Sequence, residues 1–178
     1  MTILNLPNTL TITRIVMIPL FVISIIYGKD QYALYLFGIA ALTDTFDGLI
    51  ARLKKQKTAL GTFLDPLADK FLLVTSFVLF SVYGPIPKWL TITIISRDVI
   101  VITGWVLLFV VTHEARVEPS VMGKIAIALQ MLLIWYVLLR KNFSALPDIG
   151  IYLIWITAAF TIISGLHYIY RGLRQANV

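Results

Sequence analysis

The sequence predicts an all-α integral membrane protein, built as one bundle of six transmembrane helices. Hydrophobic residues make up 59% of the 178 residues, and charged residues only 13%. A soluble domain has about 45–50% apolar and about 25% charged residues. The connectors between the apolar stretches are short. We therefore expect residues 1–178 to form a single transmembrane domain.

Six apolar stretches have close to the roughly 20 residues that cross the hydrocarbon core of a bilayer. They cover residues 9–27, 31–53, 64–83, 89–111, 121–139 and 149–169. The first stretch has no basic segment before it and no small-residue cleavage site, so we interpret it as a retained helix and not as a signal peptide. Pro66 lies near the start of the third stretch, where it suits the first turn of a helix.

The basic residues predict the orientation in the membrane, because an even number of spans places both termini on one side. That side holds Arg52, Lys54, Lys55, Lys57, Arg116, Lys124, Arg171 and Arg174. The opposite connectors hold Lys29, Lys88, Arg140 and Lys141. The excess predicts cytoplasmic termini. We attribute the net charge of +6 to loops that face anionic lipid headgroups, and we expect no nucleic-acid partner.

Four aspartates lie at the cytoplasmic ends of the second and third stretches. Asp44 and Asp47 are three residues apart, and Asp65 and Asp69 are four apart, so each pair shares one face of a helix. A connector that contains Gly61 can bring the two faces together. Four close carboxylates repel one another unless cations lie between them. Because such a site offers oxygen ligands only, it favours Mg²⁺ or Mn²⁺.

Small residues accompany the first aspartate pair. Gly48 and Ala51 share its helix face and leave room for a bulky ligand, and Arg52 adds positive charge. Phosphate is the expected guest. Two alternatives compete: aspartates that merely cap helices or pair with lysines, and an ion or proton transporter, because transporters also use intramembrane carboxylates. Transporters usually contain internal repeats and broken helices, and neither is evident in this sequence, so transport is the weaker hypothesis.

The spacing Asp44-x2-Asp47-Gly48-x2-Ala51-Arg52-x8-Gly61-x3-Asp65-x3-Asp69 resembles the motif of the CDP-alcohol phosphotransferase family. The resemblance implies a membrane enzyme, commonly a homodimer, that uses two divalent cations, Mg²⁺ or Mn²⁺. Such an enzyme moves a phosphatidyl group from a CDP-linked lipid to an alcohol and releases CMP. The implied metal ligands are Asp44, Asp47, Asp65 and Asp69, with Asp69 also acting as the catalytic base. The implied CDP-binding residues are Asp47, Gly48, Ala51, Arg52, Gly61 and Asp65.

Further positions resemble family residues that contact lipid or acceptor phosphates. They are Asn8, Thr9, Arg14, Arg97, Arg116, Ser120 and Lys124. Three of these residues also have a simpler interpretation. Arg14 can be a snorkelling interfacial arginine, Arg97 can pair with its neighbour Asp98, and Lys124 can be a plain cytoplasmic lysine. The aromatic residues near the helix ends, Tyr168 among them, are interpreted as membrane-interface residues.

The resemblance implies CDP-diacylglycerol as the donor, whereas the acceptor depends on local residues. Phosphatidylglycerophosphate synthases commonly carry a Lys-Thr pair where this chain has Ala126 and Ile127, and an arginine after a Glu where this chain has Asp98. These departures weaken a pocket for the dianionic phosphate of glycerol 3-phosphate. We therefore favour phosphatidylglycerol as the acceptor, which makes cardiolipin, with glycerol 3-phosphate as the alternative. The expected location is the bacterial cytoplasmic membrane, with the active site at its cytoplasmic face.

Overall fold

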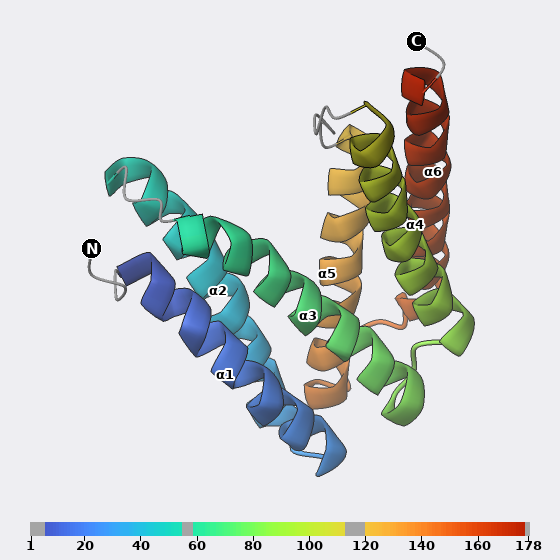
Figure 1. Cartoon of the computed structure of the whole chain (residues 1–178). Coiled ribbons are helices and arrows are strands. Elements are labelled where there is room, and N and C mark those ends of the chain that lie inside the picture. The colour runs from blue at the N-terminus through green and yellow to red at the C-terminus, as the bar shows by residue number, and fades with distance from the viewer. Residues whose placement is uncertain (1–5, 55–58, 113–119, 177–178) are drawn as a thin grey trace. The chain divides into compact units, whose positions relative to one another are not determined.

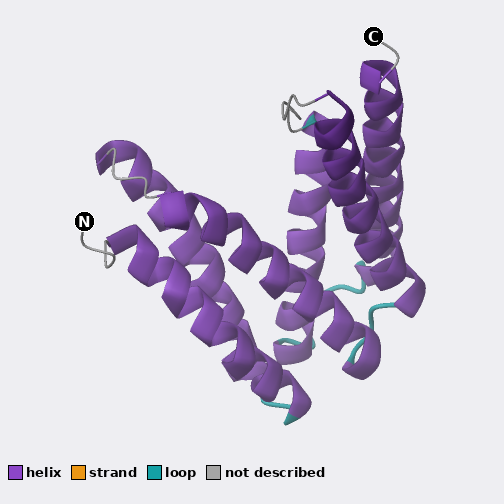
Figure 2. Ribbon diagram, in the orientation of Figure 1, coloured by secondary structure: helices purple, strands orange, loops and turns teal. Residues whose placement is uncertain are grey.

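Every regular element in the described part of the chain is an α-helix (Figure 2). The computed structural model describes residues 6–54, 59–112 and 120–176, and it describes side chains for 12–43, 67–108, 110 and 120–174. Figure 1 labels the helices along the chain. They are α1 (Leu6–Ile26), α2 (Asp30–Lys54), α3 (Ala59–Tyr83), α4 (Lys88–Thr112), α5 (Val121–Asn142) and α6 (Gly150–Ala176).

The six helices match the six predicted stretches, with one informative difference at the start of α3. This helix begins at Ala59, five residues before the apolar stretch. Pro66 therefore lies inside α3 and not in its first turn, and Gly61 lies in the helix and not in the connector. A helix satisfies its backbone hydrogen bonds internally, so it can extend beyond the apolar segment into a polar environment.

Three helices are long and apolar enough to cross a membrane, within the residues whose side chains are described. These segments are Lys88–Leu108, Val121–Asn142 and Gly150–Arg174, and Ile12–Ile26 is a shorter apolar segment. The described part of the chain thus contains six helices at the six predicted stretches, and three of the six expected spans meet the length and hydropathy criteria. The remaining spans and the cytoplasmic location of the termini stay predictions.

The chain divides into two compact units, and the first contains α1, α2, α3 and residues 138–145. Helix α1 packs against both α2 and α3. The rings of Phe21 and Phe37 lie 6.0 Å apart between α1 and α2. Ala33 and Ala40 are buried on α2, and their small side chains let the two helices approach closely. Helix α1 therefore contributes to the core of this unit through its contacts with α2 and α3.

Helix α1 ends in a left-handed glycine, Gly28, whose φ is +65°. The N–H of Gly28 donates to the carbonyl of Ile25 at 3.1 Å, and the N–H of Lys29 donates to that of Ser24 at 2.7 Å. These two bonds form a Schellman motif, which satisfies carbonyls that the helix end would otherwise leave open. The sharp stop lets α2 begin at Asp30 and run back along α1.

The second compact unit contains α4, α6 and residues 121–137 of α5. Helices α4 and α6 pack together, and the rings of Trp89 and Trp155 lie 5.2 Å apart. The hydroxyl of Tyr136 donates to the carbonyl of Pro147 at 2.7 Å and accepts the N–H of Ile149 at 3.0 Å. Because Tyr136 belongs to α5, these bonds fix the connector that leads into α6.

Candidate functional site

The predicted aspartate pairs lie on the two helices expected to carry them. Asp44 and Asp47 belong to α2, and Asp65 and Asp69 belong to α3. Their helical spacing places each pair on one face of its helix. The side chains of Asp44, Asp47 and Asp65 lie outside the described part of the structure, as do those of Gly48, Ala51, Arg52 and Gly61. The roles of these residues stay predictions.

Asp69, the predicted catalytic base, forms an ion pair with Arg14. Nη1 of Arg14 donates to Oδ1 of Asp69 at 2.6 Å, which joins α1 to α3 inside the first unit. The Arg14 side chain is fully buried, whereas that of Asp69 is 32% exposed. A hydrogen bond between ionised groups is about twice as strong as a neutral one. The arginine therefore restrains the carboxylate while leaving part of it accessible.

This geometry bears on one of the two interpretations of Arg14. A snorkelling arginine places its guanidinium in the interfacial water, but that of Arg14 is buried against α3. The snorkelling interpretation is therefore wrong. Contact of Arg14 with the lipid diphosphate stays a prediction, as do the phosphate-binding roles of Asn8 and Thr9. Both of these residues belong to α1, and their side chains lie outside the described residues.

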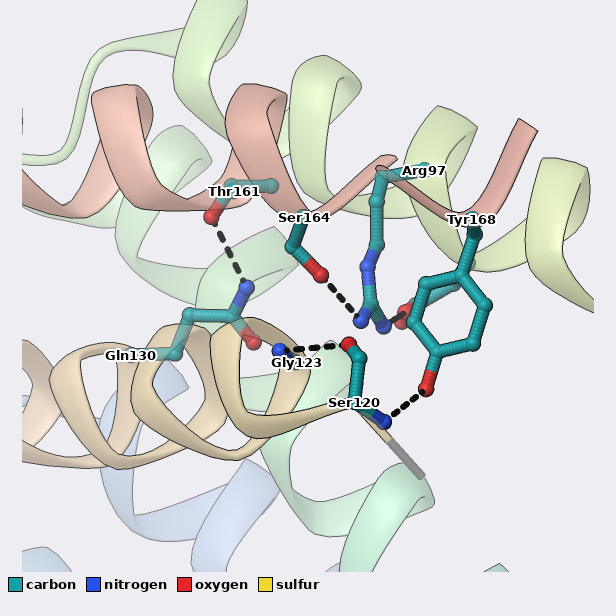
Figure 3. A network of polar contacts seen from close by, with 8 residues as sticks. Arg97, Ser120, Gly123, Gln130, Thr161, Ser164 and Tyr168 are labelled. Atoms are coloured by element: carbon teal, nitrogen blue, oxygen red, sulfur yellow. Dashed lines mark hydrogen bonds and ion pairs between the residues drawn. The ribbon is translucent and has the colours of Figure 1, made fainter. Parts of the chain in front are cut away.

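Arg97 lies at the centre of a polar network in the second unit (Figure 3). Its Nη1 donates to Oδ1 of Asp98 at 3.0 Å, and its Nη2 donates to Oγ of Ser164 on α6 at 2.7 Å. The guanidinium carbon lies 5.4 Å from the ring centroid of Tyr168. Arg97 is only 6% exposed. The expected Arg97–Asp98 ion pair exists, but two α6 side chains also contact the guanidinium.

Ser120 joins the same network as the N-cap of α5 (Figure 3). Its Oγ accepts the N–H of Gly123 at 3.0 Å, and its carbonyl accepts the N–H of Lys124 at 3.1 Å. A serine N-cap satisfies backbone donors that the first helical turn leaves open. The Ser120 N–H itself donates to the hydroxyl of Tyr168 at 3.2 Å.

The structure brings together two of the predicted phosphate-binding residues of this unit, Arg97 and Ser120. Both residues lie next to Gly123, because a Cβ atom at this glycine would lie 3.1 Å from Arg97 Nη2 and from Ser120 Oγ. Both also contact Tyr168. Lys124 follows on α5 with an exposed side chain. Arg116 lies outside the described residues.

The sequence interpretation missed Ser164 and assigned Tyr168 to the membrane interface. A polar stripe on an otherwise apolar helix is the signal that identifies them. Thr157, Thr161, Ser164 and Tyr168 recur at steps of four, three and four residues, which places them on one face of α6. The first three are fully buried, and Thr161 Oγ1 accepts a bond from Gln130 Nε2 of α5 at 3.1 Å.

The helical fold, with three segments that could cross a membrane and two groups of buried polar residues, is typical of an integral membrane protein. The family model for CDP-alcohol phosphatidyltransferase matches residues 4–163. The chain belongs to this family of transferases, whose members use a CDP-linked lipid and an alcohol acceptor in phospholipid biosynthesis. The motif resemblance found in the sequence is thereby confirmed.

The chain is similar to proteins that are named for two activities. A CDP-diacylglycerol–glycerol-3-phosphate 3-phosphatidyltransferase of Sodalis glossinidius is 34% identical over 176 residues, covering 95% of each chain. The Bacillus subtilis protein of the same name is 33% identical over 194 residues, covering 97% of this chain and 99% of that one. The human cardiolipin synthase (CMP-forming) is 34% identical over 190 residues, covering 96% of this chain and 62% of that protein.

Proposed function

We propose that this protein transfers the phosphatidyl group of CDP-diacylglycerol to a hydroxyl of glycerol 3-phosphate, forming phosphatidylglycerophosphate and CMP. The observation that carries this proposal is the match with the Sodalis and Bacillus proteins, which extends over at least 95% of their lengths and of this chain. Both proteins are named for glycerol 3-phosphate as the acceptor. The comparison therefore favours what the sequence interpretation held as its alternative.

The proposed cofactors are two divalent cations, Mg²⁺ or Mn²⁺. The chemistry of the donor set fits them, because Asp44, Asp47, Asp65 and Asp69 supply carboxylate oxygens, the ligands that hard cations prefer. When bound, such ions neutralise negative charge on the diphosphate of the donor. Gly48, Ala51, Arg52 and Gly61 are the proposed contacts of the nucleotide.

Asp69 is the proposed general base that accepts the proton of the attacking hydroxyl. A base must hold a fixed position within hydrogen-bond reach of that proton. The buried Arg14 supports this role, because its 2.6 Å bond to Oδ1 restrains the carboxylate, which remains 32% exposed. Arg14 thus orients the base, and the lipid diphosphate is its second proposed contact.

Arg97 is the proposed ligand of the acceptor phosphate, with help from Ser120, Lys124 and Arg116. Guanidinium groups bind phosphate oxygens through two parallel N–H donors. Two of the five N–H groups of Arg97 are used by Asp98 and Ser164. Among the described residues, none accepts a hydrogen bond from Arg97 Nε, although this atom is buried. The guanidinium therefore retains donors for a ligand.

The proposed setting is the bacterial cytoplasmic membrane. Six apolar stretches of sufficient length support six spans. The excess of basic residues on one side of these spans supports cytoplasmic termini and an active site at the cytoplasmic face. The family match over residues 4–163 supports one enzymatic domain, and the resemblance to the family supports a homodimer.

Cardiolipin synthesis is the second candidate function, and a specific observation favours it. Ala126 is fully buried on α5 and supplies no cation where phosphatidylglycerophosphate synthases commonly have lysine. The Asp98 carboxylate already neutralises part of the charge on Arg97. Fewer cations suit phosphatidylglycerol, whose phosphodiester carries one negative charge.

A competition assay separates the two functions. Purified protein is supplied with Mg²⁺, CDP-diacylglycerol and equal concentrations of glycerol 3-phosphate and phosphatidylglycerol, and the lipid products are identified by mass spectrometry. The proposal predicts phosphatidylglycerophosphate as the main product, together with stoichiometric CMP. Cardiolipin as the main product would replace the first candidate with the second.

A further inference from the structure

We propose that Tyr168 is a positioning residue for the acceptor. It keeps the side chain of Arg97 and the first turn of α5 in fixed positions relative to each other. This inference rests on the proposed role of Arg97 as the ligand of the acceptor phosphate. All the residues that carry it belong to the second compact unit. They are Arg97 of α4, Ser120 and Gly123 at the start of α5, and Ser164 and Tyr168 of α6.

Tyr168 contacts two of the predicted phosphate-binding residues with different parts of one side chain (Figure 3). Its ring lies 5.4 Å from the guanidinium carbon of Arg97, within the range of a cation–π interaction. Its hydroxyl accepts the N–H of Ser120 at 3.2 Å. Because Ser120 caps α5, one tyrosine connects the arginine of α4 to the first turn of α5.

The contact with the ring leaves the hydrogen-bonding capacity of Arg97 intact. A cation–π interaction uses the face of the aromatic ring and consumes no N–H donor. Ser164 and Asp98 fix the two Nη atoms, while Nε has no partner among the described residues. The guanidinium is thus held on several sides and still has donors for a phosphate oxygen.

Two glycines make room for this arrangement. A Cβ atom at Gly123 would lie 3.3 Å from Cε2 of Tyr168 and 3.1 Å from Nη2 of Arg97. A Cβ atom at Gly165 would lie 3.3 Å from Cγ of Arg97. Since a Cβ atom at either position would lie closer to Arg97 than an ordinary van der Waals contact, the two glycines leave the space that the arginine occupies. The ring of Tyr168, 5.4 Å from the guanidinium carbon, lies beside the same space.

The alternative is that Tyr168 is only an aromatic residue of the membrane interface. Tyr170 offers a matched control, because it lies two residues further on α6 and is 65% exposed. An interface role predicts similar effects at both positions. A positioning role predicts that only Tyr168 affects the acceptor.

The test uses the full-length protein and the variants Tyr168→Leu, Tyr168→Phe, Ser164→Ala and Tyr170→Leu. The Michaelis constants for CDP-diacylglycerol and for the acceptor are measured separately from CMP release, and thermal unfolding reports on folding. The wild type is first assayed with glycerol 3-phosphate and with phosphatidylglycerol. The acceptor that it uses serves for all variants, so an error in the proposed function appears in the wild type and is not confused with an error in this inference.

We expect Tyr168→Leu to raise the acceptor KM about tenfold, because it loses both the ring and the hydroxyl. Tyr168→Phe keeps the ring, so the increase should be about threefold. Ser164→Ala should raise the acceptor KM by a similar amount, about threefold to tenfold, because Nη2 of Arg97 loses its partner. The donor KM should stay within about twofold in all variants, as should both constants of Tyr170→Leu.

Two results would overturn the inference. One is an unchanged acceptor KM in both Tyr168 variants. The other is an equal rise of the donor and acceptor KM values, which indicates general damage and no specific positioning. If Tyr168→Leu fails to fold, Tyr168→Phe still decides the matter, because it removes only the hydroxyl that accepts the N–H of Ser120. An unchanged acceptor KM in Tyr168→Phe then overturns the inference.

Discussion

The two compact units differ in how their charged side chains are distributed along the chain. In the first unit, all four predicted metal ligands come from one continuous segment, residues 44–69. In the second unit, Arg97 contacts Ser164, 67 residues away, and Ser120 contacts Tyr168, 48 residues away. A motif at fixed spacing therefore reveals the carboxylates, whereas the surroundings of the arginine depend on how three helices pack.

From this difference we infer that the two units bind different substrates. We assign the cations, the donor diphosphate and the base to the first unit, and the phosphate of the acceptor to the second. The predictions below test whether changes in each unit affect the expected kinetic constant.

Removal of divalent cations should have the largest effect. EDTA in excess should abolish CMP release, because four carboxylates without cations cannot hold a diphosphate. Addition of Mg²⁺ or Mn²⁺ above the chelator concentration should restore the activity, and EDTA already saturated with Mg²⁺ is the control. Full turnover in free chelator would contradict the assignment of the first unit.

Replacement of the base should have the next largest effect. Asp69→Asn should lower kcat by about 10²–10⁴-fold, the usual contribution of a general base, while binding of CDP-diacylglycerol is largely retained. The measurement is kcat from CMP release, together with equilibrium binding of the donor. Asp30→Asn is the matched control, because Asp30 pairs with Lys141 at 2.7 Å in the same unit and has no proposed catalytic role. Near-native kcat in Asp69→Asn would show that the proton goes to another group.

Replacement of Arg14 sharpens the account of the first unit. Arg14→Lys keeps the charge but changes the geometry of the 2.6 Å bond to Asp69. We expect kcat to fall by about tenfold to a hundredfold, since the loss of a hydrogen bond between charged groups costs about 1.5–3 kcal/mol. Steady-state kinetics with varied donor concentration checks this. A higher donor KM at unchanged kcat would instead place Arg14 on the lipid diphosphate alone.

Replacement of Lys124 should have the smallest effect. Its side chain is exposed, so an acceptor phosphate near it remains partly in contact with water and salt. We expect Lys124→Ala to raise the acceptor KM by about threefold to tenfold, and the difference from wild type to shrink at high salt. Lys88→Ala, at the exposed start of α4, is the control. If Lys124→Ala and Lys88→Ala behave alike, Lys124 has no role in the site.

Local patterns in the sequence predicted most of the fold. Hydropathy identified all six helices, because each apolar stretch is long and its ends carry polar residues. The start of α3 at Ala59 escaped this criterion, because a helix can continue where hydropathy falls. The spacing of the aspartates follows from the helical period alone, and the resemblance to a known motif supplied the cytidine nucleotide.

Long-range side-chain contacts could not be predicted in the same way. Arg14 and Asp69 are 55 residues apart, and their ion pair depends on which face of α1 meets α3. By residue type and by its place near a helix end, Tyr168 resembles an aromatic residue of the membrane interface. Its contacts with Arg97 and Ser120 depend on how α6 packs against α4 and α5. The choice of acceptor likewise depends on more than local residues. Two absent cations favour phosphatidylglycerol, whereas similarity over the whole chain favours glycerol 3-phosphate.

The kinetics of Arg97→Lys tests most directly whether the second unit binds the acceptor. This change keeps a positive charge beside Asp98 but removes the planar group that can bind phosphate through two bonds. The account predicts an acceptor KM raised by about tenfold to a hundredfold, with the donor KM and with kcat at saturating acceptor both close to wild type. A donor KM raised equally, or a kcat that saturating acceptor does not restore, would contradict the assignment of the acceptor to the second unit.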